Sequence, residues 1–212
     1  MKDIDVFDES YNRLPQYTAS IDEVHTKGLW HQTFACWLVN KDRQDIYLQH
    51  RGPKNRIDPG SFDASASGHL YTGEKPDDGF REMREELGIK VGEDTVYKLG
   101  VFRNIAYRKN NSYINHEFCH IYMLDTTKTL DDLTPEEGEV NNVYALSVDE
   151  GLQLFKGEVS TVKIRDKDNN LKTISIEDMC NHTMRSGDIS NYYLKILLCA
   201  QDLIFGKTDI YI

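Results

Sequence analysis

Residues 68–89, GHLYTGEKPDDGFREMREELGI, carry the pattern that decides the fold of this chain. Pro76 suits the first turn of a helix, and the acidic residues after it suit the positive end of the helix dipole. Gly88 is a typical residue at a helix stop. The segment therefore predicts a helix over residues 76–87, preceded by a glycine-bearing turn.

Three glutamates share one face of this predicted helix. Glu82, Glu85 and Glu86 stand at positions i, i+3 and i+4, where like charges repel each other. Arg81 can pair with Glu85 one turn further on. Converging carboxylate oxygens suit a hard divalent cation, so the pattern favours Mg²⁺ or Mn²⁺ over Zn²⁺. The same spacing also occurs on solvated acidic helix faces, and the pattern alone leaves that alternative open.

Apolar and β-branched segments on both sides of this helix predict a sheet. Before the helix we expect a strand hairpin from residues 31–39 and 45–50, followed by a long loop up to Gly68. After the helix we expect strands over 95–102, 114–124 and 142–146, a short helix over 148–155, a hairpin over 161–176 and an amphipathic helix over 189–205. The order of elements indicates an α+β fold with a mixed or mainly antiparallel sheet.

Composition narrows the class of protein. The chain has 212 residues, 39% of them hydrophobic, which suits one globular domain with an extension. A net charge of −10 argues against a nucleic-acid partner. Four widely spaced cysteines form no CxxC pair, and no apolar run approaches the length of a membrane span. We therefore expect a cytoplasmic protein with no membrane association.

The segment around the glutamates resembles the box of the Nudix hydrolases, written G-x5-E-x7-R-E-U-x-E-E-x-G-U with U a bulky aliphatic residue. Its positions are filled by Gly68, Glu74, Arg81, Glu82, Met83, Glu85, Glu86, Gly88 and Ile89. Six residues rather than seven separate Glu74 from Arg81, so we expect a tighter turn into the helix. The stretches VHTKGLWHQTFACWLVN, LQHRGP and DASASGHLYTGE are similar to the subgroup that also contains isopentenyl-diphosphate isomerase.

The resemblance covers roughly residues 20–155 and implies a fold. This fold is the Nudix α/β/α sandwich, in which the box forms a loop, a helix and a second loop beside a mixed sheet. We place an N-terminal segment in residues 1–28 and the Nudix domain in residues 29–160. Residues 161–212 then form a C-terminal extension, a hairpin and a helix, packed on that domain.

The resemblance also implies a reaction. Nudix hydrolases cleave a nucleoside diphosphate linked to another moiety, by attack of a metal-activated water on phosphorus. The implied metal ligands are Glu82, Glu85, Glu86 and the carbonyl of Gly68, with Mg²⁺ as the cofactor and Mn²⁺ as a substitute. Arg81 would orient the acids through a salt bridge.

The remaining roles are implied less directly. The general base could be any of Glu82, Glu117, Glu136, Glu137 and Glu139, and we include Glu117 with Glu82, Glu85 and Arg81 in the expected catalytic set. Substrate contacts are expected from Arg51, Lys54, His69 and Glu74. The expected partner is a small nucleoside diphosphate derivative, and the resemblance allows a homodimer. Nothing in the sequence identifies the leaving group.

Two other functions stay open. An isomerase of the same subgroup would use three histidines and an acid, and the chain has comparable residues in His25, His31, His69 and Glu117. It has Ser67 where that enzyme has its acidic cysteine, and Asn115 where it has a second acid. Serine is too weak an acid for that role, which argues against isomerisation. A catalytically silent nucleotide sensor is the other alternative, although sensors usually lose the box glutamates.

Overall fold

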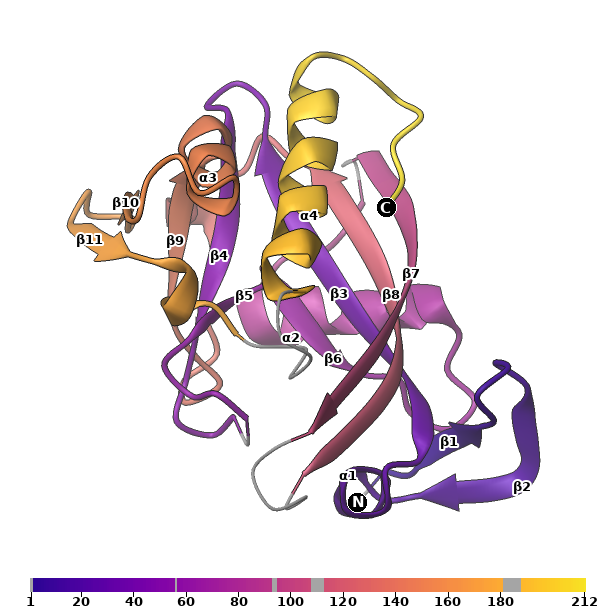
Figure 1. Cartoon of the computed structure of the whole chain (residues 1–212). Helices are drawn as coiled ribbons and strands as arrows, with labels where there is room; N and C mark the ends of the chain where they lie inside the picture. Colours follow the sequence, from indigo (N-terminus) through magenta and orange to yellow (C-terminus); the bar gives the residue numbers. More distant parts are fainter. Residues whose placement is uncertain (1, 56, 93–94, 108–112, 181–187) are drawn as a thin grey trace.

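A mixed sheet with helices on both of its faces forms the centre of the structure (Figure 1). The computed structural model describes residues 2–55, 57–92, 95–107, 113–180 and 188–212. The strands are β1 (Ile4–Phe7), β2 (Arg13–Ala19), β3 (Trp30–Asn40), β4 (Asp45–Arg51), β5 (Phe62–Asp63), β6 (Ala66–His69), β7 (Thr95–Tyr107), β8 (Ile114–Asp125), β9 (Val140–Ser147), β10 (Val162–Arg165) and β11 (Leu171–Ile174). The helices are α1 (Ile21–Lys27), α2 (Arg81–Leu87), α3 (Val148–Phe155) and α4 (Asp188–Ile204).

Strand β3 is the spine of this sheet. It pairs antiparallel with β1, β4 and β6, and parallel with β8 from Trp30 opposite His116 to Val39 opposite Asp125. Strand β7 continues the sheet beyond β8, and β9 to β11 continue it beyond β4. All of the strands from β1 to β11 thereby belong to one sheet.

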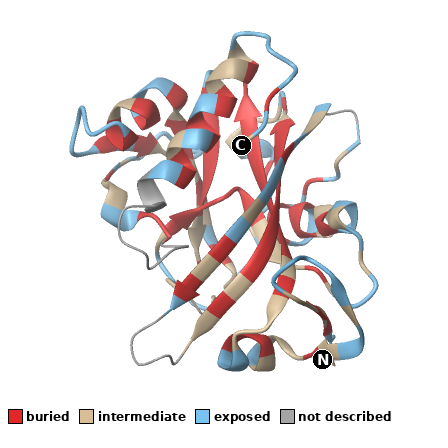
Figure 2. Ribbon diagram, turned by 45° about the vertical axis from the view of Figure 1, so that its right-hand side comes forward, coloured by how far each residue is buried: buried red, intermediate tan, exposed pale blue. Residues whose placement is uncertain are grey.

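Both faces of β3 are covered, which explains why its sequence is a continuous apolar run. Phe34 and Leu38 belong to the core beneath α2, whereas Ala35 and Trp37 belong to the core beneath α3 and α4. Figure 2 shows buried residues concentrated along the central strands and on the helix sides that face them. This layering confirms the expected α/β/α sandwich.

The predicted hairpins and helices are confirmed, with two corrections ahead of α2. The expected long loop up to Gly68 contains two short strands, β5 and β6, which pair with β4 and β3. Residues 76–80 form a 3₁₀ turn rather than the first turn of an α-helix. The backbone N–H of Lys75 donates to Asp78 Oδ2 at 2.7 Å and closes this turn. A 3₁₀ turn uses fewer residues per turn than an α-helix, so it fits the short spacing between Glu74 and Arg81.

The N-terminal elements were not predicted. Strand β1 pairs with β2 and meets β3 where Phe7 lies opposite Trp30. Helix α1 begins after Ser20, whose side chain accepts from the N–H of Glu23, and ends at Gly28 with φ of 64°. This geometry fixes α1 beside the lower end of β3 and β8 (Figure 1).

The C-terminal helix α4 packs on α3 and on the sheet. Its buried side chains include Tyr193, Ile196, Leu197 and Ala200. Gly151 of α3 permits the close approach, because a Cβ there would lie 2.9 Å from a methyl group of Leu197. Within the part of the chain that the structure describes, no helix is long and apolar enough to cross a membrane.

Replacing Gly79 with alanine should destabilise the fold. A Cβ at this position would lie 2.5 Å from the ring of Phe34, in the packed layer between β3 and the 3₁₀ turn. Overpacking of this kind costs about 1–3 kcal/mol, and each kcal/mol lowers Tm by about 2–4 °C in a chain of this size. Thermal unfolding of Gly79→Ala should show this loss. The control Gly92→Ala, where the added Cβ has no atom within 4 Å, should keep its Tm; equal Tm values would contradict the packing argument.

Candidate functional site

A pocket of about 320 Å³ is lined by residues from both faces of the sheet, among them Phe34 and Ala35 of β3. Its walls come from β3, β6, β7 and β8, from helix α2, and from segments near both ends of the chain. Glu82 and Glu86 line one side of it, and Glu117 lines another. The pocket therefore brings together carboxylates that lie far apart in the sequence.

Helix α2 buries two of its three glutamates. Glu82 is 8% exposed and Glu86 is 6% exposed, whereas the side chain of Glu85 is 44% exposed. Glu86 Oε2 accepts hydrogen bonds of 3.0 Å from Gln49 Nε2 and from the backbone N–H of Ser67. These bonds hold one carboxylate at the pocket wall while Glu85 points to the outer side.

Gly68 gives Glu82 the room that it occupies. A Cβ at position 68 would lie 1.9 Å from Glu82 Oε1, so any larger residue would displace this carboxylate. The glycine backbone consequently reaches the carboxylate directly. This close approach is the physical reason for a glycine at the first position of the box.

Arg81 ties the acids together from behind the pocket. Its Nη1 donates to Glu82 Oε1 at 2.6 Å and to Glu85 Oε2 at 3.2 Å, and its Nε donates to Glu74 Oε1 at 2.9 Å. Its Nη2 donates to the backbone carbonyl of His69 at 2.6 Å. Arg81, Glu74 and Glu85 lie outside the pocket lining, so their geometry suits orienting the buried acids.

Burial gives the two pocket glutamates unusual protonation behaviour. Desolvation raises the pKa of Glu82 to about 7, and the Coulombic attraction of Arg81 offsets part of this effect. Desolvation and the negative charge of Glu82 together raise the pKa of Glu86 to about 8. A divalent cation would offset both costs, because it restores a favourable environment for two ionised carboxylates. The residues present therefore fit a bound divalent metal.

Of the expected substrate contacts, Arg51, Lys54 and His69 line the pocket. Arg51 Nη1 donates to the buried carboxylate of Asp63 at 3.0 Å, and its Nε donates to a backbone carbonyl. Lys54 Nζ donates to the carbonyl of Glu137 at 2.8 Å. The positively charged groups of Arg51 and Lys54 therefore lie in the pocket wall, where a bound phosphate could contact them.

The candidate general bases are separated by the fold. Glu82, Glu117 and Glu139 line the pocket, whereas Glu136 and Glu137 lie outside it. Glu117 is 9% exposed, and its Oε1 accepts from Asn104 Nδ2 at 2.6 Å. That bond fixes one oxygen of Glu117 and leaves its other oxygen for a ligand.

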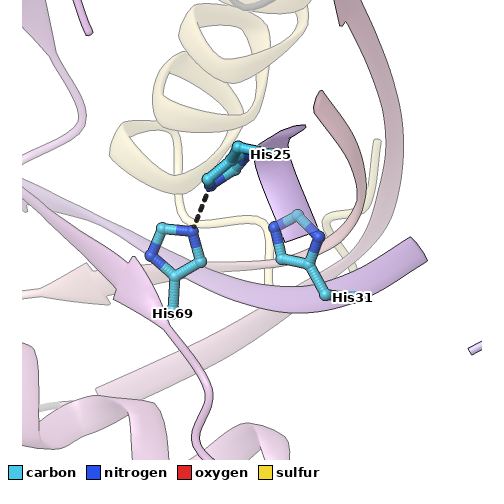
Figure 3. Close-up of side chains that lie close together, drawn as sticks. All are labelled: His25, His31 and His69. Carbon is cyan, nitrogen blue, oxygen red and sulfur yellow. Dashed lines mark hydrogen bonds between the residues drawn. The ribbon is translucent and has the colours of Figure 1, made fainter. Parts of the chain in front are cut away.

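Three histidines from three different elements meet beside the pocket (Figure 3), and two of them, His25 and His69, line it. His25 comes from α1, His31 from β3 and His69 from β6, and one ring nitrogen of each lies within 4.8 Å of the others. His25 Nε2 and His69 Nε2 share a hydrogen bond of 2.9 Å. Neutral imidazole nitrogens at this spacing are suitable ligands for a divalent transition metal.

His31 supports that interpretation. It is 0% exposed, and its Nδ1 is hydrogen-bonded to the carbonyl of Leu29 at 2.9 Å. Among the described residues, its Nε2 has no hydrogen-bond partner although it is buried. A backbone bond on one nitrogen and an unmet second nitrogen are typical of a metal-binding histidine. Glu117 lies opposite His31 in the parallel pairing of β3 and β8.

Sequence reasoning missed several pocket residues. Asn104 and Phe102 line the pocket because β7 pairs with β8, which places them opposite Glu117 and Cys119. Tyr192 reaches the pocket from α4. The alternation along β7 could have indicated which side chains share a face, but only the strand register shows what they face.

Comparisons with known proteins agree with this geometry. The sequence model of the NUDIX domain matches residues 29–165. An uncharacterized Nudix hydrolase of Clostridium acetobutylicum is 33% identical over 161 residues, which cover 75% of this chain and 76% of that protein. Nudix hydrolase 3 of Arabidopsis thaliana is 30% identical over 131 residues, 60% of this chain and 17% of that protein.

Two further similarities bear on subgroup and fold. The isopentenyl-diphosphate Delta-isomerase of Corynebacterium diphtheriae is 31% identical over 134 residues, 61% of this chain and 70% of that protein. The crystal structure of DR0079 from Deinococcus radiodurans superposes with a TM-score of 0.57 at 18% identity, covering 74% of this chain and 90% of that one. The structural similarity supports the fold alone.

Glu86→Gln should change how stability depends on pH. In the folded state the pKa of Glu86 lies near 8, above its usual value of 4.5, so the folded protein retains a proton that the unfolded chain releases. The stability that this group contributes is therefore present below pH 4.5 and is lost as the pH rises to 8. Glutamine carries no such proton, so the variant should lack this loss of stability.

The measurement is Tm in EDTA at pH 5, 6.5 and 8 for both proteins. Wild type should lose Tm relative to Glu86→Gln as the pH rises, and the comparison cancels the titration of the histidines. Saturating Mg²⁺ should suppress the trend, because the cation stabilises the ionised carboxylate. A difference in Tm that stays constant across this range would refute the assigned burial of Glu86.

Proposed function

Because the chain belongs to the Nudix family, we propose that it is a metal-dependent pyrophosphohydrolase acting on a nucleoside diphosphate linked to another moiety. The observation that carries the proposal is the buried pair Glu82 and Glu86 beside Gly68 in the pocket. We propose Mg²⁺ as the cofactor, with Mn²⁺ as a substitute. The four cysteines are buried and none of them is in a disulfide, which supports a reducing, cytoplasmic setting.

The proposed ligands are Glu82, Glu85, Glu86 and the carbonyl of Gly68. When bound, a divalent cation neutralises diphosphate charge and lowers the pKa of an attacking water. Glu85 can join the other two glutamates by a rotation about its own side-chain bonds, because it is exposed and its ion pairs are with arginine side chains. Arg81 holds the set in place through its bonds to the acids.

Other pocket residues take the remaining proposed roles. Arg51 and Lys54 bring positive charge to the substrate phosphates, and His69 stands next to Gly68 at the same wall. Glu117 is the proposed base that accepts the proton of the attacking water, since it is buried, lines the pocket and is oriented by Asn104. Glu74 acts through Arg81 rather than on the substrate.

Substitution of the glutamates should abolish turnover. Glu82→Gln and Glu85→Gln should each lower kcat by at least about 100-fold, since even residues behind metal ligands are worth 10- to 100-fold. The assay measures product release from nucleoside diphosphates linked to sugars, nucleotides and phosphates, with Mg²⁺, Mn²⁺ or EDTA. Glu158→Gln, an exposed site outside the pocket, serves as the matched control and should keep wild-type activity. Tight nucleotide binding without any product would favour the sensor alternative and reject the hydrolase.

The histidine cluster favours a second proposal about the same pocket. We propose that His25, His31 and His69 bind a divalent transition metal separate from the glutamate site. Because the isomerase uses comparable histidines, this cluster makes an isomerase-like activity the second candidate function. Ser67 and Asn115 weigh against it, because they replace groups that would supply acid chemistry.

Metal content should separate the two sites. After equilibrium dialysis against Mn²⁺, His31→Gln with His69→Gln should lose one equivalent of bound metal and retain the glutamate site. Glu82→Gln with Glu86→Gln should show the opposite loss. Equal metal content in wild type and the histidine variant would refute the histidine site, and formation of dimethylallyl diphosphate from isopentenyl diphosphate would establish the isomerase.

A further inference from the structure

The pocket changes from polar to apolar along the sheet. At one end Glu117 of β8 and Asn104 of β7, which both line the pocket, lie side by side in the strand register. Two residues further along the strands, the corresponding pocket residues on β8 and β7 are Cys119 and Phe102, and Thr33 of β3 lies beside Cys119. The part of the pocket wall formed by β7 and β8 therefore becomes apolar with distance from Glu117.

Tyr192 covers this apolar end from α4. It lines the pocket together with Phe102, Ala35 and Cys119, and its ring lies 4.8 Å from that of Phe102, centroid to centroid. Helix α4 lies on the same face of the sheet as α3 (Figure 1) and outside residues 29–165, the part that the NUDIX model matches. A residue beyond the family domain thus forms one boundary of its pocket.

The neighbouring Tyr193 fixes the position of Tyr192. Its ring stacks on Phe155 at 5.3 Å and meets Trp37 edge-on at 5.8 Å. Its hydroxyl donates to the carbonyl of Cys180 at 3.1 Å. Because Tyr193 is 2% exposed and held on several sides, α4 cannot rotate to withdraw the preceding tyrosine from the pocket.

The two ends of the pocket suit different parts of one ligand. Glu82 and Glu86, which meet Gly68 and Ser67 of β6, provide the charged side, where a metal-bound diphosphate fits. On the other side of β3, the wall of Phe102, Cys119 and Tyr192 offers apolar surface and suits an uncharged group. A ligand that occupies the whole pocket is therefore a diphosphate that carries an apolar substituent.

We propose that Tyr192 is a specificity-determining residue that limits the length of the apolar group on the diphosphate. The inference rests on the proposed function, because it takes this pocket as the substrate site. The phenol ring closes the apolar end, so short substituents fit in front of it and long ones collide with it. Truncating the ring extends the apolar end toward Trp37, which packs behind it at 6.3 Å.

The test compares the methyl, butyl and octyl esters of ADP. For wild type, kcat/KM should fall from butyl to octyl, and Tyr192→Ala should raise the octyl-to-butyl ratio by about tenfold or more, the scale on which pockets discriminate methylene groups. Tyr192→Phe keeps the ring and should keep the wild-type ratio. Leu198→Ala, at an exposed site on the same helix, is the matched control and should also keep it.

Calorimetric binding of the same esters, with Ca²⁺ in place of Mg²⁺, separates this inference from the proposed hydrolase. Binding that shows the shift in ratio without any hydrolysis would reject the hydrolase and retain the role of Tyr192. If folded Tyr192→Ala hydrolyses the esters with an octyl-to-butyl ratio of kcat/KM within twofold of the wild-type ratio, the inference is overturned. It is also overturned if Leu198→Ala raises this ratio as much as Tyr192→Ala does. Tyr192→Leu replaces Tyr192→Ala if the latter does not fold, and failure of wild type to bind any ester also overturns it.

Discussion

The burial of two carboxylates side by side is the constraint on which the site depends. Glu82 and Glu86 lose hydration on folding, and their charges oppose each other. The fold offsets these costs with Arg81 behind one acid and with Gln49 and the Ser67 amide on the other. Compensation remains incomplete without a cation, as the raised pKa values of both acids indicate. The buried carboxylates of α2 therefore favour the binding of a cation, in a chain whose net charge is −10.

The pocket is completed by segments on both sides of residues 29–165. Helix α1 contributes His25 from the N-terminal side, and α4 contributes Tyr192 from the C-terminal side. Each segment joins the same sheet or packs on it, so neither can move without changing a wall of the pocket. The central region then supplies the carboxylates, while the flanking segments determine which ligands can reach them. This division agrees with the general separation between a fold and the sites built on it.

Local patterns predicted much of the fold and singled out Glu82 and Glu86, which line the pocket. The spacing of the glutamates, Pro76 and Gly88 predicted α2, and apolar alternation predicted most strands, because these signals lie within a few residues. The 3₁₀ turn and the different burial of Glu85 and Glu86 depend on contacts with β3, β4 and β6, which no local pattern shows. The parallel pairing of β3 with β8 is likewise non-local. The placement of Glu117 beside the histidines follows from that pairing, and the role of α4 follows from packing, so neither could be read from local patterns.

At Ser67, the residue before Gly68, the backbone and the side chain have separate roles. Ser67 donates its backbone N–H to Glu86, a bond that any residue except proline could make. The side chain at this position is therefore free to vary without disturbing the carboxylate. By resemblance, a cysteine here belongs to an isomerase, and serine removes the acid while leaving the glutamates of α2 in place. Asn115 likewise replaces an acid of the isomerase, at a position on β8 that lines the pocket. Its Oδ1 is buried and has no hydrogen-bond partner among the described residues. Ser67 and Asn115 thus both weigh against the isomerase alternative, because neither side chain can supply the acid that proton transfer to carbon requires.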